Sequence, residues 1–168
     1  MVLGISASGR TPYVSGALKY ARDLGAKTIA LTVNPNSTIT KLANVVICPF
    51  TGPEIITGST RMKAGTAQKL VLNMISTCVM IKMGKVHDNL MVDLRPVSKK
   101  LVERQKRIVM EALAVSYSES EKILESAKGS VKIAILMGKT GLKYGNAKKL
   151  LEQTNNSLEN ALRGAIVS

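Results

Sequence analysis

The sequence is poor in aromatic residues and in histidine. It has no tryptophan, one phenylalanine, four tyrosines and one histidine in 168 residues. So few rings argue against a surface that stacks bases or holds sugars on aromatic side chains. The single histidine, His87, excludes a metal site with several histidine ligands and a serine–histidine catalytic triad. We expect no metal or other cofactor, and we expect His87 to lie on the surface at a helix end.

Cysteine and long apolar runs are scarce as well. The two cysteines, Cys48 and Cys78, each lie within an apolar stretch, which predicts buried free thiols in a reducing compartment. The first residues run straight into a strand pattern and do not resemble a signal peptide. No apolar run approaches the roughly 20 residues that span a membrane. We therefore expect a soluble, cytoplasmic protein without a membrane partner.

Acidic residues are few: 11 Asp and Glu stand against 24 Lys and Arg, a net charge of +13. This excess suggests a nucleic-acid partner, but the charge is spread out. Eleven basic and four acidic residues precede residue 96, and 13 and seven follow. The densest cluster is Lys99, Lys100, Arg104, Lys106 and Arg107. It falls on an amphipathic helix and is typical of a solvated face. We expect no nucleic-acid partner and infer that acidic residues balancing this charge lie in a segment that the chain lacks.

Strand and helix patterns alternate over the first half of the chain. Apolar segments predict strands at residues 2–6, 27–33 and 43–48. Between the first two, apolar residues recur at helical spacing, at Val14, Ala17, Leu18 and Ala21. Thr11 suits the helix N-cap, Pro12 suits the first helical position and Gly25 suits the end. This alternation predicts an α/β fold with a parallel sheet. Three strands are few for such a sheet, which suggests part of a larger domain.

Helical patterns dominate the rest of the sequence. The longest helix has the apolar stripe Ala67, Leu70, Val71, Met74, Ile75, Cys78 and Val79. After Pro96, helices are expected at residues 97–115, 144–153 and 158–166, and another opens with the capping-box sequence Ser118–Glu121. Residues 131–137 suit a strand as well as a helix. We place a domain boundary near residue 95, with an α/β part at residues 1–95 and a small helical domain at residues 96–168.

A first candidate site follows the first predicted strand, in the sequence Ser6-Ala7-Ser8-Gly9-Arg10-Thr11. Backbone N–H groups and serine and threonine hydroxyls at a strand-to-helix turn suit a phosphate, and Gly9 allows the backbone to approach it closely. An ordinary capped turn is the alternative. The segment also nearly matches a P-loop, but Arg10 stands where lysine is required and no strand ends in an aspartate for magnesium, so nucleotide hydrolysis is disfavoured.

A second candidate site lies at the start of the long helix, in the sequence Thr57-Gly58-Ser59-Thr60-Arg61-Met62-Lys63. Arg61 and Lys63 oppose the helix dipole there, and an anionic ligand would resolve the conflict. The alternative is that both side chains extend into water. Glu54, in the preceding loop, could touch a ligand, whereas Asp93 is better explained as structural. No pair of carboxylates has a spacing that suits general acid–base catalysis.

Both segments resemble one family. The sequence Gly4–Val14 is similar to the second phosphate-binding turn of the N-acetylmuramic acid 6-phosphate etherases, and Pro53–Lys69 resembles that family's long signature. Gly84–Val86 and Asn89–Asp93 extend the likeness, and the helical tail extends it more loosely to the end of the chain. The resemblance implies a partial sugar isomerase (SIS) fold, with three αβα layers around a parallel sheet, followed by a small all-helical domain.

The resemblance also implies an activity and roles for residues. The family eliminates D-lactate from N-acetylmuramic acid 6-phosphate, removing the C2 proton, and then adds water to give N-acetylglucosamine 6-phosphate for cell-wall recycling. It needs no metal or redox cofactor, and such modules usually form homodimers. The implied phosphate ligands are Ser6, Ser8, Gly9, Arg10 and Thr11. The implied pocket or subunit-interface residues are Glu54, Ser59, Thr60, Arg61 and Lys63.

The resemblance has one large gap. The two catalytic glutamates of the family and its first glycine-rich turn lie upstream of the part covered here, so no residue of this chain inherits a catalytic role. The chain is expected to be a fragment that is inactive alone. In addition, His87-Asp88 stand where an aromatic residue and a glycine are usual. Two alternatives remain: a non-catalytic sugar-phosphate-binding regulatory module, similar to the glucokinase regulatory protein, and a sugar-phosphate isomerase, which the long signature disfavours.

Overall fold

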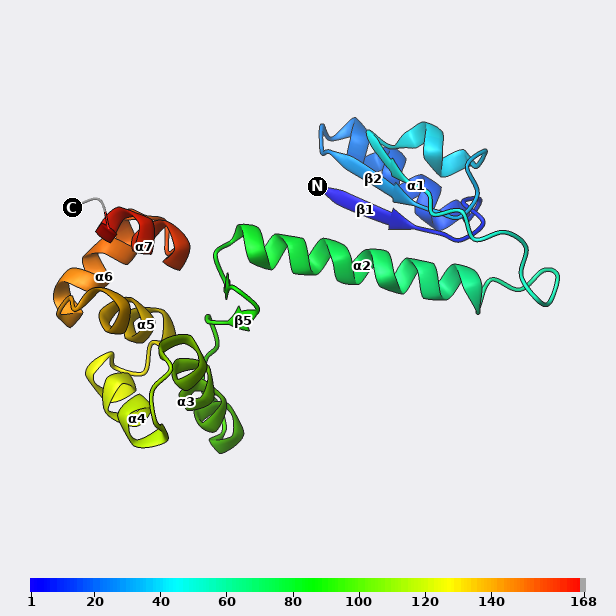
Figure 1. Cartoon of the computed structure of the whole chain (residues 1–168). Coiled ribbons are helices and arrows are strands. Elements are labelled where there is room, and N and C mark those ends of the chain that lie inside the picture. The colour runs from blue at the N-terminus through cyan, green and yellow to red at the C-terminus, as the bar shows by residue number, and fades with distance from the viewer. Residues whose placement is uncertain (167–168) are drawn as a thin grey trace. The chain divides into compact units, whose positions relative to one another are not determined.

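The computed structural model describes residues 1–166. These form two compact units, of which the first is Met1–Ser76 and the second begins at Thr77. The first unit contains a parallel sheet of three strands in the order β1-β2-β3 (Figure 1). The strands are β1 (Val2–Ile5), β2 (Thr28–Leu31) and β3 (Val45–Ile47). In their register, Ile5 lies beside Leu31, and Leu31 beside Ile47. The predicted α/β class and parallel sheet are confirmed, each predicted strand being shorter than expected.

One face of this sheet is covered by α1 (Pro12–Asp23) and by the 3₁₀ helix η1 (Thr38–Leu42). Leu18 of α1, Ala30 of β2 and Ile39 of η1 form the core between them and are fully buried. A side chain at Gly4 would collide with Leu18, so this glycine lets β1 lie close against α1. The layer therefore fixes where β1 ends and α1 begins, which is where the first candidate site lies.

The long helix α2 (Lys63–Lys82) forms as predicted, but its apolar side chains are not buried. Met74 is 62% exposed, Leu70 is 45% exposed and Val79 is 46% exposed. Ala64, in the first turn, is the one residue of this helix that is buried among those described. Cys78 is exposed too, so the prediction of a buried thiol there was wrong; Cys48 is half-buried, and both cysteines are free. The sequence periodicity identified the helix but not what covers it.

The second unit pairs a short hairpin with a helical bundle. The hairpin consists of β4 (Val86–His87) and β5 (Leu90–Met91), which are antiparallel. The helices are α3 (Lys99–Leu113), α4 (Tyr117–Ser126), α5 (Val131–Thr140), α6 (Tyr144–Gln153) and α7 (Leu158–Ile166). Val109, Ile135, Leu136 and Leu158 are at most 1% exposed and form the centre of one apolar core. Val92 joins the same core, so the segment after the hairpin packs with the helices.

In this unit two expectations were wrong, and one segment that the sequence left open is now assigned. The N-cap of α4 is Ser116, which forms a capping box with Glu119, so the box begins two residues earlier than predicted. The ambiguous residues 131–137 are helical and lie in α5. His87 is in β4 and only 5% exposed, contrary to the predicted surface position. Local patterns locate these elements. The ring nitrogens of His87, however, face Lys139 of α5 and Glu159 of α7. The burial of His87 therefore depends on these two helices packing over the hairpin.

The first compact unit ends within α2, and this division does not test the domain boundary predicted near residue 95, which stays a prediction. Among residues 1–166, no helix is both long and apolar enough to cross a lipid bilayer.

Candidate functional site

Three consecutive carbonyl groups of the first candidate turn point back into the protein. The carbonyl oxygens of Ala7, Ser8 and Gly9 all accept hydrogen bonds from the segment that follows β2. The donors, at 3.1–3.2 Å, are Val33 N and Thr32 Oγ1 for Ala7, Asn34 Nδ2 for Ser8, and Ile39 N for Gly9. Because the C=O of one residue and the N–H of the next point in opposite directions across a peptide, the anchored carbonyl of Ala7 turns the N–H of Ser8 outward. The N–H groups of Gly9 and Arg10 donate within the turn, to Ser6 and to Ser8 Oγ.

Three N–H groups in and beside the turn have no partner among the described residues. Within residues 1–166, no hydrogen bond uses the N–H of Ala7, Ser8 or Thr11. Thr11 is the N-cap of α1 by position, but its side chain does not cap the helix. The first turn of α1 therefore adds its positive dipole end to a set of unused donors, which is the arrangement that binds phosphate in proteins.

Hydroxyl groups at the turn are held in place by one another and by the backbone. Ser6 Oγ and Thr11 Oγ1 are 2.9 Å apart and share a hydrogen bond. Ser6 Oγ also accepts from Gly9 N at 3.0 Å, and Ser8 Oγ accepts from Arg10 N at 3.3 Å. Ser6 is buried, whereas Ser8, Arg10 and Thr11 are exposed. The structure thus brings all five predicted phosphate ligands together on one turn, with three of their side chains open to solvent.

Gly9 is required at its position for two reasons. Its φ of +66° is in the left-handed region, and a Cβ built there would overlap the side chain of Ser37 and approach Thr32 Oγ1 to 2.9 Å. Ser37 is 1% exposed, and its hydroxyl has no hydrogen-bond partner among the described residues. The segment after β2 is therefore packed directly behind the turn.

The second candidate site is organised by Glu54. Its two carboxylate oxygens accept hydrogen bonds from the backbone N–H groups of Lys63 and Ala64, each at 3.1 Å. These two bonds, the one from Lys63 first, hold the pKa of Glu54 below its usual value. Lys63 Nζ donates to Pro53 O at 2.8 Å. Glu54 thus supplies the negative charge that the start of α2 favours. Its carboxylate offsets the charges of Arg61 and Lys63, so these two cations do not require an anionic ligand.

The other residues of the second motif lie on an open loop. Ser59 Oγ accepts from Arg61 N at 3.3 Å, and Thr60 O accepts from Gly65 N at 3.2 Å. Thr60 and Arg61 are exposed, and Ser59 is half-buried. Among the described residues, no hydrogen bond or ion pair joins this motif to the first turn, so each motif is ordered by its own neighbours. Their assignment to a ligand stays a prediction.

Sequence reasoning missed the residues that support the first turn. Thr32, Asn34 and Ser37 were expected only to end a strand and form a turn, yet they hold the phosphate turn from behind. A signal was present: Asn34 and Ser37 carry hydrogen-bonding side chains just past a buried parallel strand, the edge where ligands meet such sheets.

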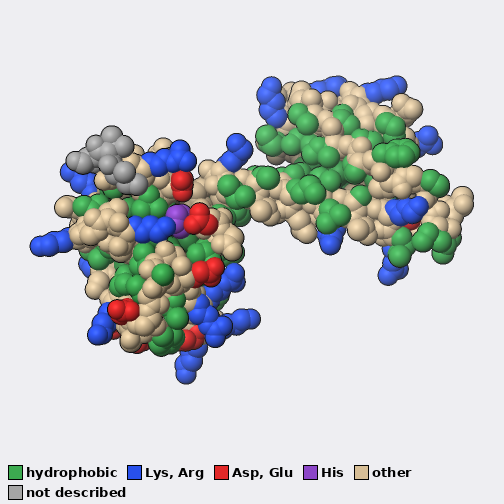
Figure 2. Space-filling model, viewed as in Figure 1, with side chains coloured by type: hydrophobic (Ala, Val, Ile, Leu, Met, Phe, Trp, Pro, Cys, Tyr) green, Lys and Arg blue, Asp and Glu red, His purple; other side chains and the backbone are tan. Residues whose placement is uncertain are grey.

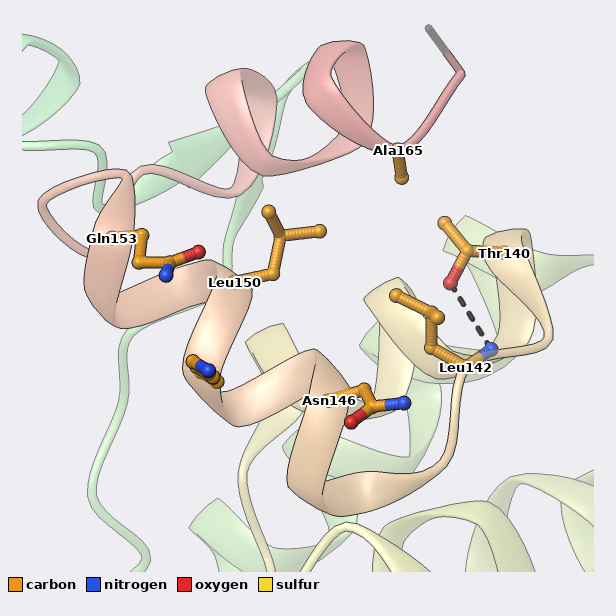
Figure 3. Close-up of a pocket in the computed structure, with 7 residues that line it drawn as sticks. Thr140, Leu142, Asn146, Leu150, Gln153 and Ala165 are labelled. Atoms are coloured by element: carbon orange, nitrogen blue, oxygen red, sulfur yellow. Dashed lines mark hydrogen bonds between the residues drawn. The ribbon is translucent and has the colours of Figure 1, made fainter. Parts of the chain in front are cut away.

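The second unit offers a hollow but no constellation of this kind. The hollow has a volume of about 420 Å³ and lies among α5, α6 and α7 (Figure 3). Its lining side chains are Thr140, Leu142, Asn146, Lys149, Leu150, Gln153 and Ala165. None of these residues was a predicted ligand. In the part of the chain that the structure describes, no group of three or more His, Cys, Asp or Glu side chains could hold a metal ion.

Comparison with known proteins shows which family this chain resembles. The SIS domain family matches residues 1–77, which include both candidate motifs. The N-acetylmuramic acid 6-phosphate etherase of Oceanobacillus iheyensis is 62% identical over 136 residues, 81% of this chain. The chain is a relative of the N-acetylmuramic acid 6-phosphate etherases. The family resemblance and the SIS-type fold expected from the sequence are thereby confirmed.

Further etherase relatives cover nearly the whole chain. The etherase of Clostridium botulinum (strain Loch Maree / Type A3) is 52% identical over 97% of this chain, and etherase 2 of Vibrio cholerae is 52% identical over 96%. The matched parts are 54% and 53% of those two proteins, and 46% of the Oceanobacillus protein. The chain therefore spans about half the length of the curated relatives it matches.

Proposed function

We propose that this chain is one half of an N-acetylmuramic acid 6-phosphate etherase and that its first turn binds the phosphate of the substrate. One observation carries the proposal: the N–H groups of Ala7, Ser8 and Thr11 have no partner among the described residues, and they lie beside the start of α1. The likeness to etherases over most of the chain supports the choice of a sugar phosphate as the anion.

Each predicted phosphate ligand has a distinct part in this proposal. Ser8 and Thr11 offer exposed hydroxyls as donors, and buried Ser6 orients Thr11 through their 2.9 Å hydrogen bond. Gly9 leaves room for Ser37 behind the turn and thereby sets the shape of the turn. The exposed guanidinium of Arg10 adds a positive charge, which strengthens hydrogen bonds to a phosphate dianion.

The second motif would line the sugar side of the same pocket. Glu54 fixes the start of α2 and leaves Ser59, Thr60, Arg61 and Lys63 at the loop that precedes and opens the helix. In this proposal Glu54 positions the motif and does not transfer protons. Its two hydrogen bonds from backbone N–H groups favour the carboxylate, which makes it a poor proton donor at neutral pH.

On its own, the chain is proposed to bind the substrate without cleaving it. Loss of D-lactate requires a base for the C2 proton and an acid for the leaving group. Residues 1–76 contain two acidic residues, Asp23 and Glu54. Asp23 is the last residue of α1, at the opposite end of that helix from the phosphate turn, and Glu54 is engaged at α2. We assign no catalytic residue here, and the catalytic groups would come from the remaining half of the enzyme.

We further propose a cytoplasmic location and a homodimer of the completed enzyme. The first is supported by the two free cysteines and the second by the family resemblance. A non-catalytic binding module is the second candidate function. The elimination needs both a base and an acid, but in residues 1–76 Glu54 is engaged at α2, which leaves Asp23 as the other carboxylate. For the chain alone, this favours the non-catalytic binding module.

The test is a calorimetric titration of the chain with N-acetylmuramic acid 6-phosphate, with an assay of the same mixture for D-lactate. We expect binding that Ser8→Ala weakens, while Ser126→Ala, an exposed serine of α4, leaves it unchanged. Lactate above background would contradict the assignment of the catalytic groups to the other half. Equal binding by wild type and Ser8→Ala would contradict the phosphate turn.

A further inference from the structure

Lys132 is a buried amine that the proposed function does not use. It lies in the first turn of α5 and is 6% exposed. Burying an ammonium group costs free energy unless its charge is well paired. Lys132 Nζ donates to the carbonyl oxygen of Asn156 at 2.8 Å, a bond that an uncharged amine can also make. Whether Lys132 is charged therefore depends on the carboxylates near it.

The carboxylate beside Lys132 is shared with a second lysine. Asp93 Oδ2 is 3.8 Å from Lys132 Nζ but only 3.1 Å from Lys85 Nζ. Burial lowers the pKa of Lys132 below the usual 10.5, and Asp93 opposes this shift while Lys85 adds to it. A lysine that is desolvated and set beside another cation is an arrangement that proteins use to make the amine nucleophilic.

A hollow gives small molecules access to this amine. It lies at the start of α5 beside α6 and has a volume of about 290 Å³, near the lower limit of about 300 Å³ for ligand pockets. Leu151 of α6 gives it apolar surface. Its charged lining residues are Lys132, Lys148, Asp93 and Glu152. Their charges balance, and Lys148 pairs with Glu152 at 3.8 Å. The hollow therefore suits a small, uncharged ligand.

We propose that Lys132 forms a Schiff base with a small, uncharged aldehyde in this hollow. The uncharged amine attacks the carbonyl carbon, and the carbonyl oxygen takes up a proton from water. The product then loses this oxygen as water while a C=N bond forms. In sum, one amine, one aldehyde and one proton from solvent give one protonated imine and one water. The N–H that remains can donate to the Asn156 carbonyl, and Asp93 lies close enough to pair with the charge.

The alternative is a purely structural lysine. Asn156 follows α6 with a φ of +57°, and the bond from Lys132 would hold its carbonyl in place. In that role the buried amine would stay charged and would react more slowly than an exposed lysine. The two possibilities therefore differ in the rate at which Lys132 reacts with an aldehyde.

The test is reductive alkylation of the whole chain with propanal and sodium cyanoborohydride at pH 7. Cyanoborohydride reduces each Schiff base to a stable propylamine, and mass spectrometry of peptides gives the rate at each lysine. Figure 2 shows Lys and Arg side chains spread over the surface of the second unit, so exposed amines provide internal references. We expect Lys132 to react at least about threefold faster than Lys148, whose side chain is 53% exposed.

Three substitutions test the cause of this reactivity. Lys85→Met leaves Asp93 to pair with Lys132 alone, which favours the ammonium and should slow alkylation of Lys132 at least about threefold. Asp93→Asn removes the carboxylate and should speed it. Lys82→Met, at an exposed position nearby, is the matched control and should change nothing. The rate at Lys148 should be the same in all four proteins, which shows that the variants remain folded.

Two results would overturn the proposal. Alkylation of Lys132 no faster than that of Lys148 would identify a structural lysine. A fast reaction that Lys85→Met leaves unchanged would mean that the pairing around Asp93 does not activate the amine. Neither result bears on the phosphate turn, whose binding of N-acetylmuramic acid 6-phosphate is measured separately.

Discussion

The hydroxyl oxygens of Ser6 and Thr11 are 2.9 Å apart, and their hydrogen bond joins the end of β1 to the start of α1. Ser6 Oγ also accepts from Gly9 N. The two side chains therefore act as one unit at the candidate phosphate turn. Ser6 is buried and orients the exposed hydroxyl of Thr11, which with the hydroxyl of Ser8 and the free N–H groups would meet a ligand.

The first prediction follows from this pairing. Thr11→Val keeps the shape of the side chain and removes its hydroxyl, which should weaken binding of N-acetylmuramic acid 6-phosphate about fivefold, the equivalent of one hydrogen bond of about 1 kcal/mol. Ser6→Ala should have a similar effect. Because the residues act together, the double variant should bind about as well as either single one. Calorimetric titration of the four proteins checks this, and simple additivity would contradict the coupling.

Gly9 and Gly25 provide a matched pair for the packing behind the turn. Both have positive φ, +66° and +75°, but a Cβ would collide with Ser37 at Gly9 and meet nothing within 4 Å at Gly25. Gly25→Ala should cost about 1 kcal/mol for the left-handed backbone. Gly9→Ala adds the steric overlap and should cost about 3 kcal/mol. Native-state amide exchange in β2 measures both, and equal costs would show that Ser37 moves aside freely.

The cap of α2 predicts a pH effect. Bonds from the N–H groups of Lys63 and Ala64 lower the pKa of Glu54 from 4.5, so the folded state favours its carboxylate. The stabilisation is present above pH 4.5 and is lost as the pH falls through the lower, folded pKa. Glu54→Gln should speed amide exchange at Lys63 and Ala64 at pH 7, whereas the exposed Glu111→Gln should not. Unchanged exchange in Glu54→Gln would mean that the cap does not order the helix.

A buried lysine predicts a second rise of stability with pH, at alkaline pH. Lys132 is 6% exposed, and burial lowers its pKa below the usual 10.5, with Asp93 opposing the shift and Lys85 adding to it. The folded state then binds fewer protons than the unfolded state, so the free energy of unfolding should rise with pH up to about 10.5. Lys132→Met should reduce this rise, and Lys148→Met, at an exposed position, should not. Urea unfolding at pH 7, 9 and 10 gives the three slopes, and equal slopes would contradict the prediction.

Ala114 predicts a stabilising substitution. It is the C-cap of α3 and has a φ of +53°, a left-handed conformation that costs a side chain about 1 kcal/mol. Ala114→Gly should therefore raise the stability of the second unit by about that amount. Ala112→Gly, two residues earlier within the helix, should lower it by about 1 kcal/mol because glycine weakens a helix interior. Thermal unfolding distinguishes them by the sign of the change in Tm.

Local sequence patterns determined much of this protein. The alternation of apolar runs predicted the three strands, Pro12 and Gly25 bound α1 as expected, and helical spacing located α2. The helices at residues 144–153 and 158–166 agree with α6 and α7. The candidate phosphate turn could be located because a strand-to-helix turn rich in serine and glycine is itself a local signal, and its assignment to a phosphate stays a prediction. Period, caps and turn residues act within a few positions along the chain, so a sequence displays them directly.

Only the tertiary structure decided what those elements contact. Whether His87 is buried depends on Lys139 and Glu159, more than 50 residues away in the chain. The role of Glu54 depends on the loop returning its carboxylate to Lys63 and Ala64, and the anchoring of the phosphate turn depends on Thr32 and Asn34. The same distinction explains α2. The spacing of its apolar residues can be seen in the sequence. The burial of these side chains requires a partner surface, and no pattern within one helix specifies that surface.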